Sequence, residues 1–145
     1  MLIGEFKHSI DSKGRITIPS KFREDLSDGF VMTKGLDNCL FVYPRSEWIK
    51  IEEELKSLPL ANKNVGSFVR TFFSGATDAN IDKQGRVLIP QNLRSHALIE
   101  IDKEAVIIGV STRAEIWSSS SWDYYNNEEG LSYEEMAEQM AELGI

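Results

Sequence analysis

Hydrophobic residues recur at every second position in two short segments of the chain, 15–18 and 86–89. A period of two is typical of a β-strand that buries one face. Each segment follows another run of residues that favour β-structure, at 6–10 and at 77–81. The pattern therefore predicts two pairs of strands, one pair in each half of the chain.

The two strands of each pair are joined by the same short sequence, Asp-x-x-Gly-Arg, which begins at Asp11 and again at Asp82. Gly14 and Gly85 stand where a tight hairpin loop needs a residue with positive φ. The aspartate and the arginine flank the loop on opposite strands, where opposite charges attract each other. We therefore expect two short hairpins, each with a glycine turn and an Asp–Arg pair.

A proline ends the second strand of each pair, and the two prolines, Pro19 and Pro90, are 71 residues apart, like the motifs that precede them. Proline is common at the first position of a helix because its missing N–H is not needed there. We expect short helices at 20–26 and 91–98. The chain therefore contains an internal repeat of strand, turn, strand, proline and helix.

The repeat extends beyond these helices when the offset grows to 74 residues. Apolar runs at 31–32 and 40–43 then align with runs at 105–110 and 114–117, and all four favour strands. One unit of four short strands and a small helix cannot bury much apolar surface by itself. We therefore expect an α+β, β-rich fold in which two pseudo-symmetric units share one core.

Between the two units the apolar residues follow the spacing of helices. Ser46 is a suitable N-cap for a helix at 47–58, which Pro59 ends, and Asn62 is a suitable N-cap for a second helix at 63–73. Together these segments predict a helical linker that packs on the β core.

The last part of the chain also favours helices. Four serines at 118–121 are expected to cap a helix that begins near Trp122. Ser132 and Glu135 form a capping box, which predicts a C-terminal helix that ends near Leu143. The apolar face of this helix is thin and suits either a solvated terminus or a contact with a partner.

Charge is unevenly distributed along the chain. It carries 16 Lys and Arg against 23 Asp and Glu, a net charge of −7. Residues 1–99 hold 14 of the basic and 12 of the acidic residues, whereas residues 100–145 hold 2 and 11. Salt screens charges beyond about 8–10 Å, so the local charge decides whether a surface attracts phosphate. The acidic C-terminal third therefore excludes a uniformly basic surface, but not a nucleic-acid contact elsewhere.

The composition also restricts the class of protein. No apolar run approaches the roughly 18 residues of a membrane span, and the first residues lack the pattern of a secretion signal. Cys39 is the only cysteine, which excludes an intramolecular disulfide and favours the cytoplasm. His8 and His96 lie in no metal-binding spacing, and no nucleophile or nucleotide-binding motif is present. We expect no enzyme activity, no metal, no cofactor, no small-molecule substrate and no membrane partner.

The first repeat is the most basic part of the chain. Arginine at the tip of a β-ribbon can bond guanine or phosphate through two parallel hydrogen bonds. Such a ribbon is thin enough to enter the major groove of DNA. Between residues 7 and 23 the basic residues are Lys7, Lys13, Arg15, Lys21 and Arg23. We predict that Arg15 contacts DNA and that its basic neighbours hold phosphates.

Two other interpretations of these residues stay open. The pairs Asp11–Arg15 and Asp82–Arg86 also suit turns that are held together without any ligand. The two aspartates would serve as paired catalytic acids only if they met in one pocket, which the sequence does not indicate. The second copy keeps Lys83, Arg86 and Arg94 but is less basic than the first, which favours an architectural role for it.

Asp-x-x-Gly-Arg, followed in the first copy by Ile-x-Ile-Pro and a short helix, resembles the AbrB/SpoVT swapped-hairpin DNA-binding domain. The chain also has Tyr-Pro-x-x-Glu-Trp from Tyr43 to Trp48, and Phe-Phe-Ser-Gly-Ala from Phe72 to Ala76. Two tandem copies with these connecting sequences resemble the MraZ family of bacterial transcriptional regulators. The resemblance covers nearly the whole chain up to about Ser121.

This resemblance implies a pseudo-symmetric double-split β-barrel made of two swapped-hairpin AbrB-like units, with a helical linker and a C-terminal helix. The expected divisions are SpoVT-AbrB-like units at 5–47 and 76–119, a helical linker at 48–75 and an acidic helical tail at 120–145. By position, the implied DNA-contact residues are Arg15, Lys13 and Asp11 in the first copy and Arg86 and Asp82 in the second. Gln84 stands where the first copy has Lys13, which weakens the expectation for the second copy.

The resemblance further implies a homo-oligomeric ring that binds short direct repeats of double-stranded DNA. These repeats would lie upstream of its own operon, the division and cell-wall gene cluster, and the protein would associate with the nucleoid. The alternative, from a different class, is a ring-forming protein-interaction scaffold that reads no DNA. The helical linker and three tryptophans suit such interfaces.

Overall fold

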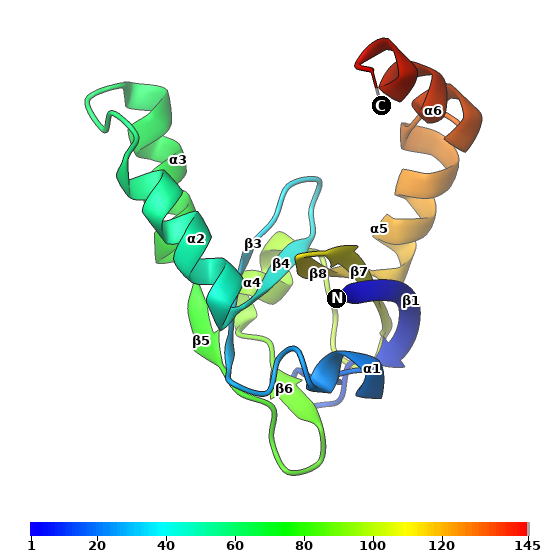
Figure 1. Cartoon of the computed structure of the whole chain (residues 1–145). Helices are drawn as coiled ribbons and strands as arrows, with labels where there is room; N and C mark the ends of the chain where they lie inside the picture. Colours follow the sequence, from blue (N-terminus) through cyan, green and yellow to red (C-terminus); the bar gives the residue numbers. More distant parts are fainter. Residues whose placement is uncertain (145) are drawn as a thin grey trace.

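The computed structural model describes residues 1–144 and shows an α+β protein (Figure 1). Its strands are β1 (Leu2–Ser9), β2 (Arg15–Thr17), β3 (Phe30–Lys34), β4 (Leu40–Pro44), β5 (Thr77–Ala79), β6 (Arg86–Leu88), β7 (Glu104–Ser111) and β8 (Arg113–Ser118). Its helices are α1 (Ser20–Arg23), α2 (Arg45–Lys56), α3 (Lys63–Ser74), α4 (Gln91–His96), α5 (Ser119–Tyr124), the π-helix η1 (Tyr125–Glu129) and α6 (Tyr133–Glu142). Six strands form one antiparallel sheet in the order β1-β7-β8-β4-β3-β5, and β2 and β6 form a separate two-stranded ribbon.

The two repeats exchange their first strands. β1 of the first unit pairs with β7 of the second, with Phe6 opposite Ile107, and β5 of the second unit pairs with β3 of the first, with Phe30 opposite Ala79. β4 and β8 pair with each other at the centre. Counted inward from one edge, β1, β7 and β8 correspond to β5, β3 and β4 counted inward from the other edge. The arrangement is therefore pseudo-symmetric.

The hairpins expected from the sequence are not formed. β1 pairs with β7 and not with β2, while β2 pairs with β6 across the two repeats. Each glycine turn therefore joins the six-stranded sheet to the ribbon, and a backbone bond from Asp11 N to Arg15 O (2.9 Å) closes the first turn. Alternation along a segment reveals a strand but not the strand that pairs with it, which is why the expectation was wrong.

The core lies between the six-stranded sheet and the ribbon. Ile16 of β2 and Val87 of β6 are buried on the inner side of the ribbon, as the alternation predicted, and Phe22 of α1 and Leu93 of α4 belong to the same cluster. Phe6 of β1 contacts Phe22 edge-on, with ring centroids 5.3 Å apart. β1 and β5 stay at the two edges of the sheet and no closed barrel is found within residues 1–144, so the double-split barrel stays a prediction.

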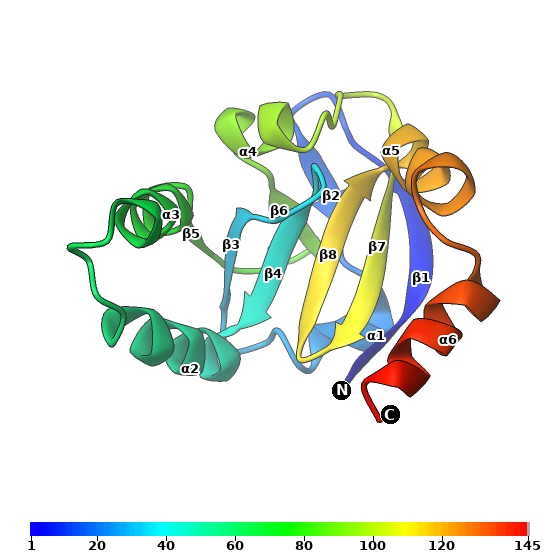
Figure 2. The ribbon, with the colours of Figure 1, turned by 90° about the horizontal axis from the view of Figure 1, so that it is seen from above.

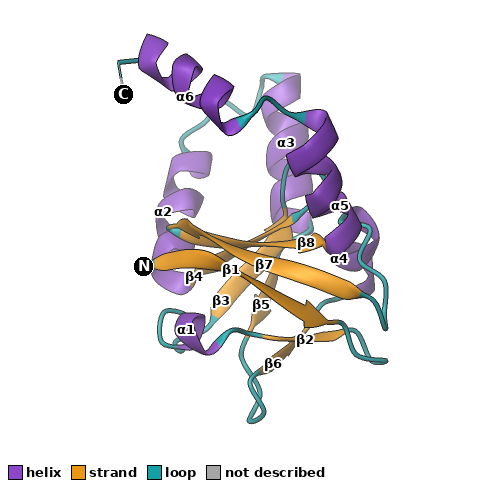
Figure 3. Ribbon diagram, turned by 90° about the vertical axis from the view of Figure 1, so that its right-hand side faces the viewer, coloured by secondary structure: helices purple, strands orange, loops and turns teal. Residues whose placement is uncertain are grey.

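Two helical arms lie on the other side of the six-stranded sheet. Helices α2 and α3 form one arm beside β3 and β4, and α5, η1 and α6 form the other beside β7 and β8 (Figures 1 and 2). Figure 3 shows the arms above the sheet, with β2 and β6 below it. The ribbon and the arms therefore occupy opposite faces of the molecule.

The helix starts follow some of the sequence signals but not all of them. Asn62 caps α3 and Ser132 caps α6, each through a side-chain oxygen that accepts a backbone N–H, as expected. The expected cap at Ser46 is wrong, because α2 begins directly after Pro44 and has no side-chain cap. At α5 the cap is Ser118, and the other serines of the run lie inside the helix.

Candidate nucleic-acid interface

The first glycine turn is held by one aspartate. Asp11 Oδ1 accepts hydrogen bonds from the backbone N–H groups of Lys13 and Arg15, both at 2.9 Å. Its Oδ2 accepts one from Arg15 Nε at 2.7 Å. Gly14 has φ of 84°, a conformation that other residues rarely adopt. The turn therefore fixes both the path of the backbone and the direction of the Arg15 side chain.

The second turn repeats this geometry. Asp82 Oδ1 accepts from the backbone N–H groups of Gln84 and Arg86, both at 2.8 Å, and its Oδ2 accepts from Arg86 Nε at 3.1 Å. Gly85 has φ of 80°. Replacing Lys13 of the first turn by Gln84 changes none of these contacts, since each residue contributes only its backbone N–H.

Each turn is also covered by an arginine of the other repeat. Arg94 of α4 donates from Nη1 to Ile89 O, and an added Cβ at Gly14 would lie 2.0 Å from that nitrogen. Arg23, the last residue of α1, donates from Nε to Ile18 O at 3.1 Å, and its guanidinium lies over Gly85. Arg23 was expected to hold phosphate, but the structure gives its Nε a backbone contact.

The ribbon presents a small outward face of four residues. Arg15 lies opposite Leu88, and Thr17 lies opposite Arg86. These four side chains alternate with the buried Ile16 and Val87, so they share the outer face. The face therefore carries two guanidinium groups, one from each repeat, which the sequence alone did not place together.

Asp11 connects the two arginines. Its Oδ2 lies 2.7 Å from Arg15 Nε and 4.0 Å from Arg86 Nη1. The arginine side chains are 28% and 26% exposed, which leaves part of each group open to solvent. Asp11 thus orients one guanidinium and attracts the other toward it.

Both aspartates are ionised at neutral pH. The pKa of Asp11 is lowered from 3.8 to about 2. The backbone N–H of Arg15 is the largest cause, and the Arg15 side chain also contributes. The pKa of Asp82 is lowered mainly by the backbone N–H of Arg86. Two carboxylates that are already occupied by N–H donors are poor general acids, so paired-acid catalysis has no support in this geometry.

The remaining basic residues divide between the two faces. Lys13 and Lys83 are exposed on the two turns, and Lys21 is exposed on α1. Lys7 of β1 lies opposite Val106, while the neighbouring Phe6 packs toward the core. Successive side chains of a strand point to opposite faces, so Lys7 lies on the side of the helical arms and away from the ribbon.

Sequence analysis missed one residue of this site, Leu88, and one contact, that of Arg94 with Gly14. Leu88 is 53% exposed on the outer face of the ribbon, and its place between the buried Val87 and Ile89 could have indicated this. Arg94 covers Gly14 from a distant part of the chain, and no local signal could have found that contact.

Other chemical features of the described chain lie outside the ribbon. No group of three or more His, Cys, Asp and Glu suited to a metal ion occurs in residues 1–144. Cys39 is buried, and burial raises the pKa of its thiol.

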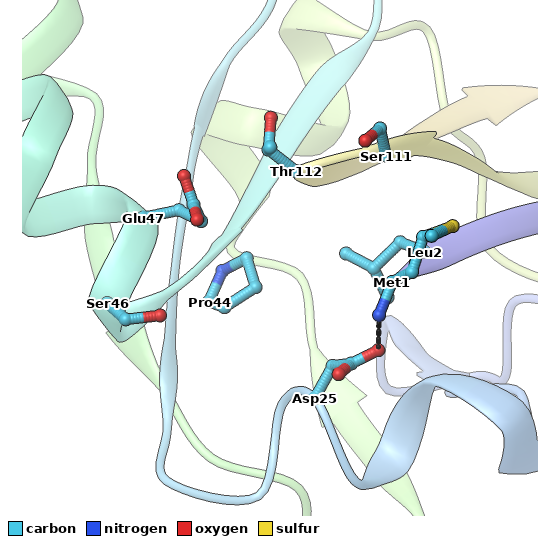
Figure 4. Close-up of a pocket in the computed structure, with 8 residues that line it drawn as sticks. All are labelled: Met1, Leu2, Asp25, Pro44, Ser46, Glu47, Ser111 and Thr112. Atoms are coloured by element: carbon cyan, nitrogen blue, oxygen red, sulfur yellow. Dashed lines mark hydrogen bonds and ion pairs between the residues drawn. The ribbon is translucent and has the colours of Figure 1, made fainter.

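A cavity of about 320 Å³ near Met1 contains the ion pair between the Met1 ammonium and Asp25, at 3.1 Å, and includes no residue of the ribbon (Figure 4). In the same residues no helix has the length and apolar character needed to cross a membrane.

The sequence is similar to one known family over nearly its whole length. A family model described as "MraZ protein, putative antitoxin-like" matches residues 1–70 and 72–143. Proteins named "Transcriptional regulator MraZ" from Alkaliphilus metalliredigens, Alkaliphilus oremlandii and Clostridium tetani are 60%, 58% and 59% identical to it. Each match covers 145 residues and 100% of both chains. On this similarity the chain belongs to the MraZ family.

Proposed function

We propose that this protein is a sequence-specific DNA-binding transcriptional regulator and that the outer face of the β2–β6 ribbon contacts the DNA. The observation that carries the proposal is the pair of guanidinium groups on that face, Arg15 and Arg86, each oriented by the aspartate of its own turn. The names of its relatives describe transcriptional regulators, which supports the same function.

The chemistry of the ribbon suits a duplex. Each aspartate engages the Nε of its arginine. The terminal nitrogens remain available to a base edge or a phosphate, although Arg86 Nη1 lies 4.0 Å from Asp11 Oδ2. An arginine held in this way can bond guanine O6 and N7 together, a contact worth about 1–3 kcal/mol of discrimination. Lys13 and Lys83, exposed at the two turns, lie where phosphate contacts would set the position of the ribbon.

The assembly that we propose is a homo-oligomeric ring on short direct repeats upstream of the protein's own operon, the division and cell-wall gene cluster, within the nucleoid. One ribbon neutralises few phosphates, so a single subunit binds weakly and linked subunits gain avidity. Direct repeats suit subunits joined head to tail, because such an interface presents every ribbon with the same polarity.

The exchange of strands between the repeats supports an interpretation of the β core as a double-split barrel. In this interpretation the SpoVT-AbrB-like units are 5–47 and 76–119, the linker is 48–75 and the acidic tail is 120–145. β1 and β5 would be the exchanged strands, and the β2–β6 ribbon would join the two halves.

The direct test is an Arg15→Ala variant in an electrophoretic gel shift with the DNA upstream of the gene. Loss of one bidentate contact per subunit should weaken binding at least tenfold, while the circular dichroism spectrum and melting curve stay close to those of the parent protein. Lys56→Ala is the matched control, because it removes one positive charge from the arm on the opposite face. Unchanged DNA affinity in Arg15→Ala would reject the proposed interface.

A second function, a ring-forming interaction scaffold that reads no DNA, is favoured by the apolar surface of the arms. Phe68 of α3 and Tyr133 of α6 are 46% and 83% exposed, and exposed apolar side chains of this size suit a contact with a partner. The same gel shift separates the two functions. A protein that forms rings but shifts no upstream DNA would be a scaffold.

A further inference from the structure

The outer face of the β2–β6 ribbon holds one exposed apolar side chain beside its two arginines. Leu88 is 53% exposed, whereas its neighbours Val87 and Ile89 are buried. A single exposed leucine is common on protein surfaces, so the exposure alone indicates no contact. The position of Leu88 is more informative, because it lies opposite Arg15 on the face that is proposed to meet DNA.

The hydrogen-bond register decides how close these two side chains are. A backbone bond runs from Ile18 N to Gly85 O, at 2.8 Å. Hydrogen-bonded and non-hydrogen-bonded pairs alternate along two antiparallel strands, and side chains are closest in the non-hydrogen-bonded pairs. The pair of Arg15 and Leu88 lies three steps from the pair of Ile18 and Gly85, so it is a non-hydrogen-bonded pair. Leu88 is therefore the nearest cross-strand neighbour of Arg15 on this face.

The spacing of this pair suits two neighbouring base pairs. Cβ atoms of directly opposite residues lie about 4.5–5.5 Å apart, and successive bases of one DNA strand lie about 3.4 Å apart. When Arg15 bonds guanine O6 and N7, the Leu88 side chain therefore lies at the edge of an adjacent base pair in the major groove.

The chemistry of leucine favours one base at that edge. The C5-methyl of thymine is the apolar group that bases present in the major groove. Against any other base edge, Leu88 would displace water without replacing its hydrogen bonds. From these observations we infer that Leu88 selects a thymine next to the guanine that Arg15 bonds, through contact with the thymine methyl. This inference deepens the proposed function and rests on it.

The matching place in the first repeat carries a different side chain. Thr17 lies opposite Arg86, 71 residues before Leu88. Threonine can contact a thymine methyl with its own methyl group, and its hydroxyl can also bond other base edges. Thr17 therefore tolerates several bases, whereas Leu88 does not. Because the two strands of the ribbon are otherwise pseudo-symmetric on this face, the difference gives the ribbon a preferred direction on a duplex.

Replacing single thymines by uracil in the upstream duplex tests the contact, because uracil lacks only the methyl group. For the parent protein, fluorescence anisotropy should find a thymine beside a guanine whose replacement weakens binding about fourfold, as expected for the burial of one methyl group. A Leu88→Ala variant should bind the thymine and uracil duplexes with equal affinity.

Two further variants are matched controls. Thr17→Ala removes a methyl and a hydroxyl group from the equivalent position and should keep the preference for thymine. Leu60→Ala shortens an exposed leucine between α2 and α3 and should change neither the affinity nor the preference. The melting curves of all three variants should match that of the parent protein, since none of the replaced side chains is buried.

Two results with these variants would overturn the inference. A preference for thymine that survives Leu88→Ala would mean that another side chain contacts the methyl group, and its loss in Thr17→Ala would identify that side chain. An equal loss of affinity for the thymine and uracil duplexes in Leu88→Ala would mean that the leucine contacts DNA without distinguishing the base.

The same titrations separate this inference from the proposed function. A parent protein that binds the upstream DNA but tolerates uracil at every thymine rejects the role of Leu88 and leaves the regulator intact. A parent protein that binds no upstream DNA rejects both the role of Leu88 and the proposed function.

Discussion

At the scale of single residues, the glycine of each turn serves two purposes. Gly14 takes a positive φ, and it also leaves the space in which the Arg94 guanidinium lies. Gly85 does the same for Arg23. The glycines thus couple the two repeats, because each one accommodates an arginine from the other half of the chain.

Gly14→Ala should destabilise the protein beyond the cost of the backbone alone. An alanine at positive φ costs roughly 1–2 kcal/mol, and its Cβ would also displace Arg94 from Ile89 O. Chemical denaturation of the single variants and of Gly14→Ala/Arg94→Ala forms a double-mutant cycle. The cost of Gly14→Ala should be smaller when Arg94 is absent. Equal costs in the two backgrounds would show that the arginine does not matter.

The titration of Asp11 should be visible in the stability of the fold. Its pKa is about 2 in the folded protein and 3.8 for an unperturbed aspartate, so folding favours the ionised form. The contribution is therefore complete above about pH 4 and is lost as the pH falls from 3.8 toward 2. A carbon-13 NMR titration of the Asp11 carboxyl group should give a midpoint near pH 2.

An Asp11→Asn variant supplies the control for this titration. Its melting temperature should lie below that of the parent protein at pH 7, and the difference should shrink as the pH falls below 4. A carboxyl midpoint near 3.8, or a difference independent of pH, would contradict the hydrogen bonds assigned to Asp11.

At the scale of elements, the exchange of β1 depends on a close approach of two backbones. Gly109 of β7 lies opposite Gly4 of β1. An added Cβ at Gly109 would lie 2.3 Å from the backbone nitrogen of Ile3. A side chain could move away from an added methyl group, but the backbone of β1 could not. Glycine at position 109 therefore allows β1 to lie against β7.

Gly109→Ala should loosen the start of β1. Extra volume in a packed contact costs about 1–3 kcal/mol, and the amide of Ile3 should exchange its hydrogen faster than in the parent protein. Gly130→Ala is the control, because an added Cβ there would come no closer than an ordinary 3.5 Å, to Tyr125 O. Unchanged exchange at Ile3 would mean that β1 tolerates the displacement.

At the scale of the whole molecule, the six-stranded sheet separates two surfaces with different chemistry. The ribbon carries the arginines on one side, and the helical arms, with an apolar cavity between α2 and α3 and the acidic α6, lie on the other. The total charge of −7 therefore says little about the local charge of the ribbon.

DNA binding should depend steeply on salt concentration, although the net charge of the chain is negative. Each phosphate contact contributes a slope of about −0.9 in log K against log salt for B-DNA, and a ring multiplies these contacts. Lys13→Ala should make the slope shallower by roughly 0.9 for each engaged subunit, as measured by fluorescence anisotropy from 50 to 200 mM salt. An affinity that does not change over this range would contradict binding through phosphates.

The sequence by itself determined the local features of this protein. The alternation around Ile16 and Val87, the glycine turns, and the caps at Asn62 and Ser132 all depend on residues within a few positions of one another, and the structure confirms them. The Asp11–Arg15 pair could be predicted for the same reason, since both residues belong to one turn.

Only the tertiary structure decided which strands pair and which side chains meet across the repeats. The pairing of β1 with β7, the shared outer face of Arg15 and Arg86, and the position of Arg94 over Gly14 join residues about 70 to 100 positions apart. Each strand could form backbone hydrogen bonds with several other strands of the chain. The choice rests on which arrangement buries both apolar faces in one core, and that is a property of the whole chain.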